Sequence, residues 1–159
     1  MNTLKKNEKG FTIIEVVLVL AIAGLIFLMV FIALPALQRS QRNTQRTQDL
    51  NRISTQVTNY MSSSRQAAPK DESEVRSFAT NYLRPADEYM DPTGESYRLS
   101  ANTLSGEAGS AGDVPVRLVG GKTCDASQAD GVSTTGSPRQ FALQILLEGQ
   151  TVPYCIDNK

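Results

Sequence analysis

The chain has 159 residues, of which 16 are Lys or Arg and 16 are Asp or Glu, so its formal net charge at pH 7 is zero. It has no His and only two Cys, which removes the commonest acid–base residue and leaves too few ligands for a usual zinc site. A phosphate-binding glycine loop and a nucleophile elbow are also missing, so the sequence predicts a non-enzymatic protein without a cofactor or a metal.

A short block near the N-terminus, Lys9-Gly10-Phe11-Thr12-Ile13-Ile14-Glu15, precedes a long apolar run. The run, residues 16–37, has no charged side chain and is long enough to cross a bilayer as a helix, which needs about 20 apolar residues. Glu15 therefore lies at one end of a predicted membrane span. A carboxylate at that depth is costly and usually marks a partner or a function.

This block resembles the N-terminal signature of type IV pilins and the related pseudopilins, over residues 5–37. The shared features are a basic leader, a Gly at the cut, a Phe after it, a Glu four residues further on and then the apolar stretch. The resemblance implies that a prepilin peptidase cleaves between Gly10 and Phe11 and that the new Phe11 amine is methylated. It also implies that Phe11 and Glu15 are the assembly residues, with Glu15 paired to the amine of a neighbouring subunit.

Two other readings of the apolar run stay open, a plain signal anchor and a cleaved secretory signal. A secretory signal is cut after its apolar region at small residues, and the stretch around Pro35 and Ala36 is a poor site of that kind. Cleavage after Gly10, whose backbone a protease can approach closely, would leave the apolar helix attached. Neither alternative accounts for Glu15, which could still be a polar residue tolerated near the membrane edge.

The sequence predicts four parts: a leader (1–10), a transmembrane and polymerisation helix (11–37), an amphipathic stem helix (38–65) and a globular head (66–159). We expect Pro35 to kink the long helix, because proline removes a backbone donor and clashes with the preceding turn. In the stem, apolar residues at helical spacing form one stripe that predicts a core-facing side. The stripe consists of Leu50, Ile53, Val57, Tyr60 and Met61.

Charge is unevenly distributed along the chain. Residues 38–65 contain five Arg and one Asp, whereas residues 66–159 contain 8 basic and 13 acidic side chains. Because Lys or Arg residues flank the span on both sides, the positive-inside rule does not decide its orientation, and the leader motif and the cysteines favour a head outside the cytoplasm. Clustered Arg attracts phosphate, but we expect the stem to face acidic heads or lipid phosphates, so direct nucleic-acid binding is not predicted.

In the head, the sequence predicts an α+β fold in which the long helix packs on a small antiparallel sheet. A second helix is expected from Ser73, with Val75, Phe78, Ala79, Tyr82 and Leu83 on one face and Pro85 ending it. Strands are expected at residues 97–99, 114–119, 139–147 and 151–156. Pro153 cannot donate to a ladder, so the last strand is expected at an edge. Residues 125–138 are rich in Gly, Ser and Thr and are expected to form an exposed loop.

The segment Asp91-Pro92-Thr93-Gly94 has turn chemistry. It resembles the turn that enters the sheet in major pseudopilins and some pilins, with Ser96 in place of a second Pro. Four nearby carboxylates could hold Ca²⁺, but they lack a recognised loop spacing, and a solvated acidic turn is the alternative that we prefer. These carboxylates are Asp87, Glu88, Asp91 and Glu95.

Cys124 and Cys155 both fall in the head, and in an exported chain they favour a disulfide over free thiols. A cysteine nucleophile would require a base such as His, which the chain lacks. In the pilin resemblance, this bond pins the C-terminal segment to the sheet.

Taken with the resemblance, the sequence predicts a structural subunit of a type IV pilus or pilus-like filament serving adhesion, surface motility or DNA uptake. A pseudopilin of a type II secretion-like system and an anchored binding module that never polymerises are the alternatives. The expected partners are other copies of the chain, the prepilin peptidase, the inner-membrane assembly platform and membrane lipid. The expected location is the inner membrane with the head outside, followed by an extracellular filament.

Overall fold

The computed structural model describes all residues of the chain except 1–9, 65–66, 84–88, 103, 105–111 and 134. The leader residues before Gly10, the predicted helix stop at Pro85 and the carboxylates of Asp87 and Glu88 lie outside this described part. Contacts divide the chain into two units, Met1–Gln38 and Arg39–Lys159. We treat each unit by itself.

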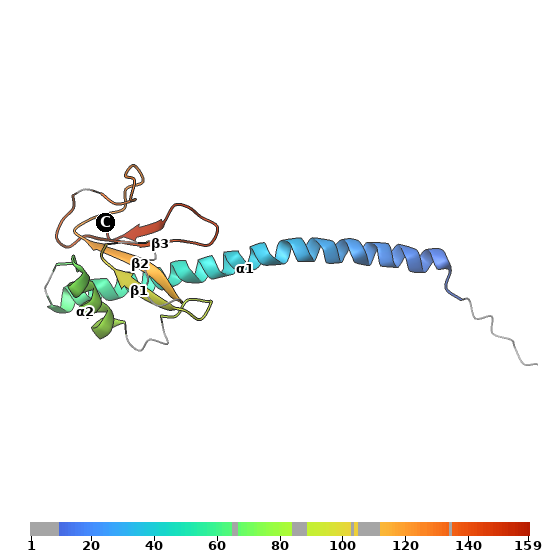
Figure 1. Ribbon diagram of the computed structural model, residues 1–159, viewed down its shortest axis with the longest axis horizontal. Coiled ribbons are helices and arrows are strands. Elements are labelled where there is room, and N and C mark those ends of the chain that lie inside the picture. The colour runs from blue at the N-terminus through green and yellow to red at the C-terminus, as the bar shows by residue number, and fades with distance from the viewer. Residues whose placement is uncertain (1–9, 65–66, 84–88, 103, 105–111, 134) are drawn as a thin grey trace, which may run out of the picture. The chain divides into compact units, whose positions relative to one another are not determined.

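The first helix, α1 (Ile13–Ser64), has 52 residues and is shown in blue to green in Figure 1. Pro35 lies inside α1, so it does not end the helix, and the expected kink stays a prediction. The predicted stripe of the stem is confirmed: Leu50, Ile53, Val57 and Met61 are buried. Tyr60 is partly buried against the same core.

The second helix, α2 (Glu72–Tyr82), is also confirmed and starts one residue before the predicted Ser73. Its N-cap is Asp71, whose carboxylate accepts a hydrogen bond from the Glu74 amide at 2.9 Å. Val75 and Phe78 are buried, and Phe78 packs against Tyr60 of the stem with ring centroids 5.6 Å apart.

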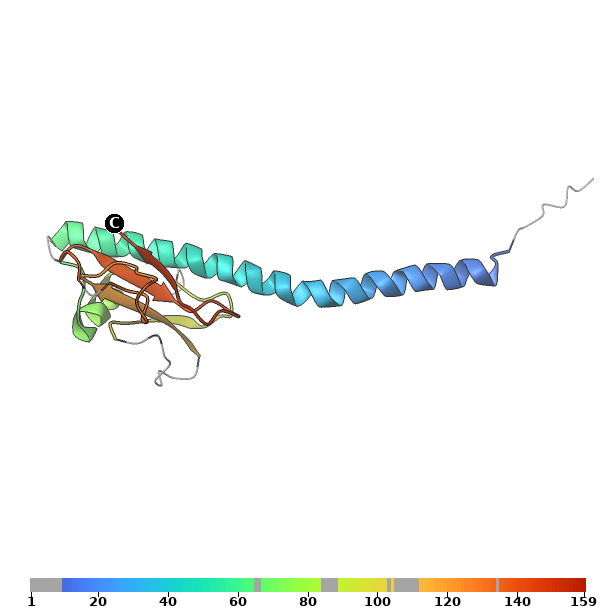
Figure 2. The ribbon, with the colours of Figure 1, turned by 90° about the horizontal axis from the view of Figure 1, so that it is seen from above.

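Four strands form one sheet in the order β1-β2-β3-β4. They are β1 (Ser96–Ser100), β2 (Asp113–Gly120), β3 (Phe141–Ile145) and β4 (Tyr154–Asp157). All four predicted strands are present, and β4 lies at an edge, with Pro153 just before it. The core lies on one face of the sheet, where Leu118, Leu143 and Ile145 belong to the same buried cluster as the stem and α2 residues. The second half of α1 runs along the sheet (Figures 1 and 2).

The prediction of an antiparallel sheet is wrong for its first pair of strands. β1 and β2 are parallel, with Tyr97 opposite Val114 and Leu99 opposite Val116, whereas β2–β3 and β3–β4 are antiparallel. Parallel neighbours need a crossover of about a dozen residues rather than a tight turn, and twelve residues separate Ser100 from Asp113 along the chain. The sheet is therefore mixed, and the fold is the expected α+β arrangement of a pilin-like head.

The sequence predicted an exposed loop at residues 125–138, but part of this loop is buried. Val132 is 1% exposed and forms a bridge with Cys124. On the face of the sheet away from the core, the Gln144 amide donates to the Asp130 carbonyl at 2.8 Å. Gln144 also accepts from Arg117 at 3.1 Å. Val132 and the buried amide of Gln144 hold the loop against the sheet. The loop therefore covers part of the outer face.

The structure joins Cys124 to Cys155 in a disulfide, and no described cysteine is free. Cys124 precedes the loop that covers the outer face, and Cys155 lies in the edge strand β4. The bond therefore fastens both the loop and the C-terminal strand to the sheet.

We expect Cys155→Ser to lower the free energy of unfolding by about 3–4 kcal/mol, because the bond closes a loop with a sequence separation of 31 residues. Urea unfolding of the full chain in detergent, followed by the tyrosine signal, measures the change. Cys124→Ser is the matched control and should give the same loss, with no further loss in the double variant. Two free thiols in non-reducing peptide maps of the wild-type chain would contradict the pairing.

Candidate functional site

The residues singled out by the N-terminal motif lie at the start of α1, just before its first turn or in it. Gly10 and Phe11 are exposed just before the helix, and Phe11 is 88% exposed. Glu15 lies in the first turn. A side chain added at Gly10 would meet no other group within 4 Å, so the peptide bond between Gly10 and Phe11 is sterically accessible.

Glu15 and Thr12 cap the helix reciprocally. The amide and the hydroxyl of Thr12 donate to Glu15 Oε2 at 3.4 and 3.2 Å, and the Glu15 amide donates to Thr12 Oγ1 at 3.4 Å. This is the capping box that Ser or Thr makes with Glu three residues later. Thr12 was missed in the sequence analysis, although the pattern of Thr, two residues and Glu before an apolar run is its sequence signal. The Glu15 carboxylate thus has local donors but no cation within its own turn.

Among the described residues of the first unit, 10–38, nothing covers the apolar half of α1. Its large side chains are exposed, from Ile13 at 84% to Leu37 at 56%. Among the described residues, α1 is the one helix long and apolar enough to cross a membrane. Such a surface is unfavourable in water, so it requires either lipid or other protein around it.

Where the head begins, two arginines of the stem bind two loops of the head. Arg46 is 7% exposed and makes a bidentate ion pair with Asp91, at 2.6 Å (Nε to Oδ1) and 3.0 Å (Nη2 to Oδ2). Arg42 binds Glu148 in the same bidentate way, at 2.7 Å for both contacts. Arg46 Nη2 also lies 3.4 Å from Glu148 Oε1, so the two ion pairs form one network.

Neutral groups complete this stem–head network. Asn43 donates to the Glu148 carbonyl at 3.2 Å and accepts from the Glu148 amide at 2.9 Å. The Tyr97 hydroxyl of β1 donates to Asp49 Oδ2 at 3.0 Å. Burial, reinforced by the charge of Asp49, raises the pKa of Tyr97, so this phenol stays protonated as a donor. Three strand or loop segments of the head are therefore held to one face of the stem.

The network also shifts the ionisation of its carboxylates. Burial opposes ionisation of Asp91, but hydrogen bonds from Arg46 and Thr93 outweigh it and lower the pKa of Asp91. The hydrogen bond from Arg42 lowers the pKa of Glu148. Both carboxylates are thus held in the charged form by the arginines.

The ion pairs bear on two alternatives that the sequence left open, calcium binding at the acidic turn and nucleic-acid binding by the stem. Oδ1 of Asp91 accepts from Arg46, and Oδ2 accepts from Arg46 and Thr93, so the charge of Asp91 is already balanced by Arg46. Among the described residues, no group of three or more acidic, His or Cys side chains could hold a metal. Arg42 and Arg46 are likewise paired with carboxylates of the same chain. This pairing lowers the net positive charge of the stem that could attract nucleic-acid phosphates.

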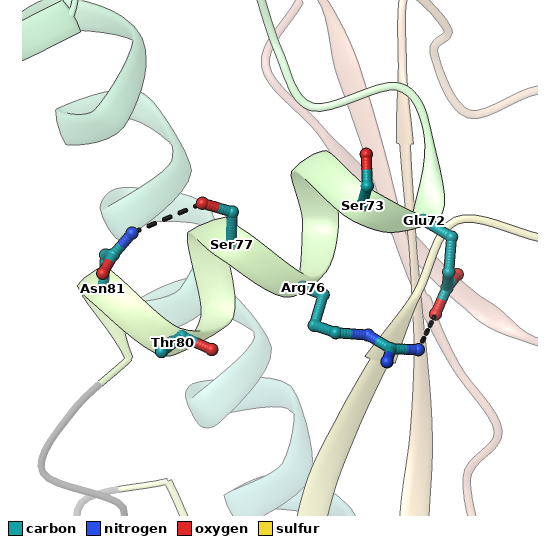
Figure 3. A pocket seen from close by; sticks show the side chains of 6 residues that line it. All are labelled: Glu72, Ser73, Arg76, Ser77, Thr80 and Asn81. Carbon is teal, nitrogen blue, oxygen red and sulfur yellow. Dashed lines mark hydrogen bonds and ion pairs between the residues drawn. The ribbon is translucent and has the colours of Figure 1, made fainter.

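A hollow of about 560 Å³ lies over the outer face of α2 and is open to solvent. Figure 3 shows its polar lining, with Arg76 pointing toward Glu72 at 3.8 Å and Asn81 donating to Ser77 at 3.4 Å. None of the residues predicted from the N-terminal motif or the acidic turn lines this hollow. All of its lining residues come from α2, so side chains of separate elements do not converge on it as in a usual ligand pocket.

Comparison with known protein families finds a match in the N-terminal part of the chain. Residues 5–31 match the family model described as the prokaryotic N-terminal methylation motif, which is the type IV pilin and prepilin signature. No curated protein and no solved structure matches the chain. The motif supports a pilin-like or pseudopilin substrate of prepilin peptidase, and the matched residues include Gly10, Phe11 and Glu15.

The stem–head network should make the head sensitive to acid. The pKa values of Asp91 and Glu148 are lowered in the folded chain, so their contribution is complete near neutral pH and is lost as the pH falls below about 4. Asp91→Asn should cost about 3 kcal/mol at pH 7, because it leaves the buried Arg46 with only the longer contact to Glu148. The variant should then lose less further stability than the wild type between pH 5 and pH 3.

Unfolding free energies of the full chain in detergent, measured across this pH range, test the prediction. Asp113→Asn is the control, since Asp113 is an exposed carboxylate at the start of β2 outside the network, and it should keep the wild-type pH profile. An Asp91→Asn profile parallel to the wild type would show that the pair does not contribute as described.

Proposed function

Starting from the prepilin signature at residues 5–31, we propose that this chain is the precursor of a structural subunit of a type IV pilus or pilus-like filament. The observation that supports the proposal is that exposed Gly10 and Phe11 directly precede, and Glu15 lies in, the first turn of a helix whose apolar side chains are exposed. The filament would serve adhesion, surface motility or DNA uptake. Its four parts would be the leader (1–10), the polymerisation helix (11–37), the stem (38–65) and the head (66–159).

Processing would convert the leader end into an assembly contact. Cleavage after Gly10 creates an amine on Phe11, and methylation of that amine keeps it positively charged. The inner-membrane peptidase acts on the accessible Gly10–Phe11 bond while residues 16–37 stay in the bilayer with the head outside. The cut therefore leaves the membrane span attached, unlike cleavage of a secretory signal.

Glu15 would then direct the addition of subunits. In hydrocarbon an ionised carboxylate requires a partner, and the Thr12 donors supply hydrogen bonds but no opposite charge. The amine of a neighbouring copy supplies that charge. Exchange of water or lipid contacts for this ion pair would fix the axial register and favour the filament over subunits dispersed in lipid.

A pseudopilin of a secretion system is the second candidate, because the Asp91–Glu95 turn resembles the one in major pseudopilins. The Gly94 amide donates to the Asp91 carbonyl at 2.8 Å, and Gly94 has φ of 87°, which suits glycine. Both candidates require cleavage, methylation and assembly through the same turn. An anchored module that never assembles gives Glu15 no role, and a visible surface filament would separate pilus from pseudopilus.

The mature chain should begin at Phe11 and carry one methyl group on its amine. Intact-mass measurement of the protein from native membranes, combined with sequencing of the N-terminal peptide, gives the result directly. Gly10→Leu should leave the precursor uncut, because a bulky side chain blocks approach to the backbone. A chain that starts at Met1, or after Ala36, would rule out the prepilin interpretation.

Glu15→Ala should abolish filaments or make them rare while the subunit accumulates normally, because the substitution removes the charge and improves the span. Glu15→Gln should also impair assembly, since an amide accepts a hydrogen bond but does not neutralise an amine. Val19→Ala, one turn further along the same helix, is the matched control and should assemble. The readout is the yield of sheared filaments by electron microscopy beside the amount of processed subunit in membranes. Normal filaments from Glu15→Ala would leave Glu15 a tolerated residue of the membrane edge.

A further inference from the structure

Two exposed carboxylates lie at the end of the sheet where β1 and β2 begin. Ser96 of β1 pairs with Asp113 of β2 in the parallel register, and Glu95 directly precedes Ser96 along the chain. Both carboxylate side chains are exposed, and neither makes an ion pair or a side-chain hydrogen bond with any described residue. We call Glu95 and Asp113 the acidic end of the head.

Two cations lie at the opposite end of the sheet, where β2 ends and β3 begins. Gly120 is the last residue of β2, and Lys122 follows it by two residues. The Gly121 amide donates to the Gln140 carbonyl at 2.7 Å, so the backbone beside Lys122 contacts the backbone beside Arg139. Arg139 is exposed and Lys122 is partly exposed. We call Lys122 and Arg139 the basic end of the head.

The acidic end and the basic end are separated by the length of β2. At about 3.3 Å per residue, the eight residues of this strand put roughly 23 Å between the backbones of the two ends. Opposite charges at this distance cannot pair within one head, so each end can only find its partner in another molecule.

Acidic side chains near the basic end are engaged within their own segments, with backbone amides or with a neighbouring hydroxyl or ammonium group. Lys122 and Arg139 make no hydrogen bond or ion pair through their side chains to the part of the chain that the structure describes, so their charge can meet an outside partner. The engaged carboxylates are Asp71, Glu74, Asp125 and Asp157.

The stem runs from the acidic end of the head to the basic end. Early in the stem, Arg46 binds Asp91 in the turn before β1. After the stem, the Ala68 amide donates to the Pro138 carbonyl at 3.0 Å, directly before Arg139. Figures 1 and 2 show the second half of α1 along the sheet between these two contacts. Copies with parallel stems would therefore turn the basic end of one head toward the acidic end of another.

We propose that the heads of neighbouring copies join end to end, with Lys122 and Arg139 of one copy against Glu95 and Asp113 of the next. A contact between two different surfaces of one chain builds rings or open helical filaments rather than closed dimers. An open filament is what the proposed function requires, and the pairing rests on that function. Because complementary charges contribute more to specificity than to affinity, the pairing selects which heads meet, while the α1 helices hold the filament together.

Charge reversal at each end tests the pairing in cells that make only the variant subunit. Lys122→Glu with Arg139→Glu makes both ends acidic, and Glu95→Lys with Asp113→Lys makes both ends basic. Each double variant should give at least about fivefold fewer sheared filaments, because like charges then face each other. The fourfold variant, which reverses both ends, should recover filaments, since its ends are complementary again.

Arg76→Glu with Thr80→Glu and Asn81→Asp is the matched control. It changes the net charge by the same amount as Lys122→Glu with Arg139→Glu, but on the outer face of α2 (Figure 3), and it should assemble like the wild type. The amount of processed subunit in membranes and the free energy of unfolding in detergent are measured beside the filament yield. Both should stay at the wild-type level in every variant.

Normal filaments from either double variant would overturn the end-to-end pairing and leave the proposed filament intact. Failure of the fourfold variant to recover filaments would also overturn it. An equal loss from the α2 control would do the same, because net charge rather than its position would then decide assembly. Failure of the wild-type chain to form filaments would instead refute the proposed function, and the pairing with it.

Discussion

An apolar helical surface without a covering partner dominates this molecule. The large side chains between Ile13 and Leu37 are all about half exposed or more, and transferring such area out of water yields roughly 25 cal/mol per Å². The head has a separate core, formed by the stem stripe, α2 and the inner face of the sheet. The first half of α1 therefore requires lipid or other helices, and Glu15 is the one ionisable group in that half.

The stem–head network fixes the position of the stem on the head. Arg46 is almost fully buried between the turn before β1 and the β3–β4 hairpin. A buried ion pair adds little net stability because both charges lose water, but its bidentate geometry orients the partners strictly. Asn43 and Tyr97 add neutral hydrogen bonds on the same side of the helix. The network thus fixes the angular position of the stem, which an apolar stripe alone leaves less well defined.

Local sequence patterns predicted the helices and strands. They did not predict which segments far apart in the sequence lie next to one another. The stripe from Leu50 to Met61, the α2 face and the alternation in β3 follow from periodicity, and Pro153 marked the edge strand. The parallel pairing of β1 with β2 depends on the route of a crossover, which has no periodic signal. Val132 was overlooked because its loop is otherwise small and polar, and only the three-dimensional structure places it on the outer face of the sheet.

The residues of the candidate site likewise include some that the sequence predicted and some that it did not. Gly10, Phe11 and Glu15 are adjacent in sequence, so their motif could be recognised without a structure, and Thr12 could have been added from its capping spacing. Arg46 and Asp91 are 45 residues apart, and nothing in the sequence pairs them. As a result, the sequence predicted stem arginines that face acidic heads or lipid phosphates and a solvated turn at Asp91, whereas the structure buries Asp91 beside Arg46.

The most direct measurement of the central claim is a cryo-electron microscopy structure of filaments sheared from native cells. The account predicts that the α1 helices pack together inside the filament, with the Phe11 amine of one copy within about 3 Å of the Glu15 carboxylate of the next. A filament that holds this chain with its apolar helices apart, or with Glu15 facing away from every Phe11 amine, would contradict it.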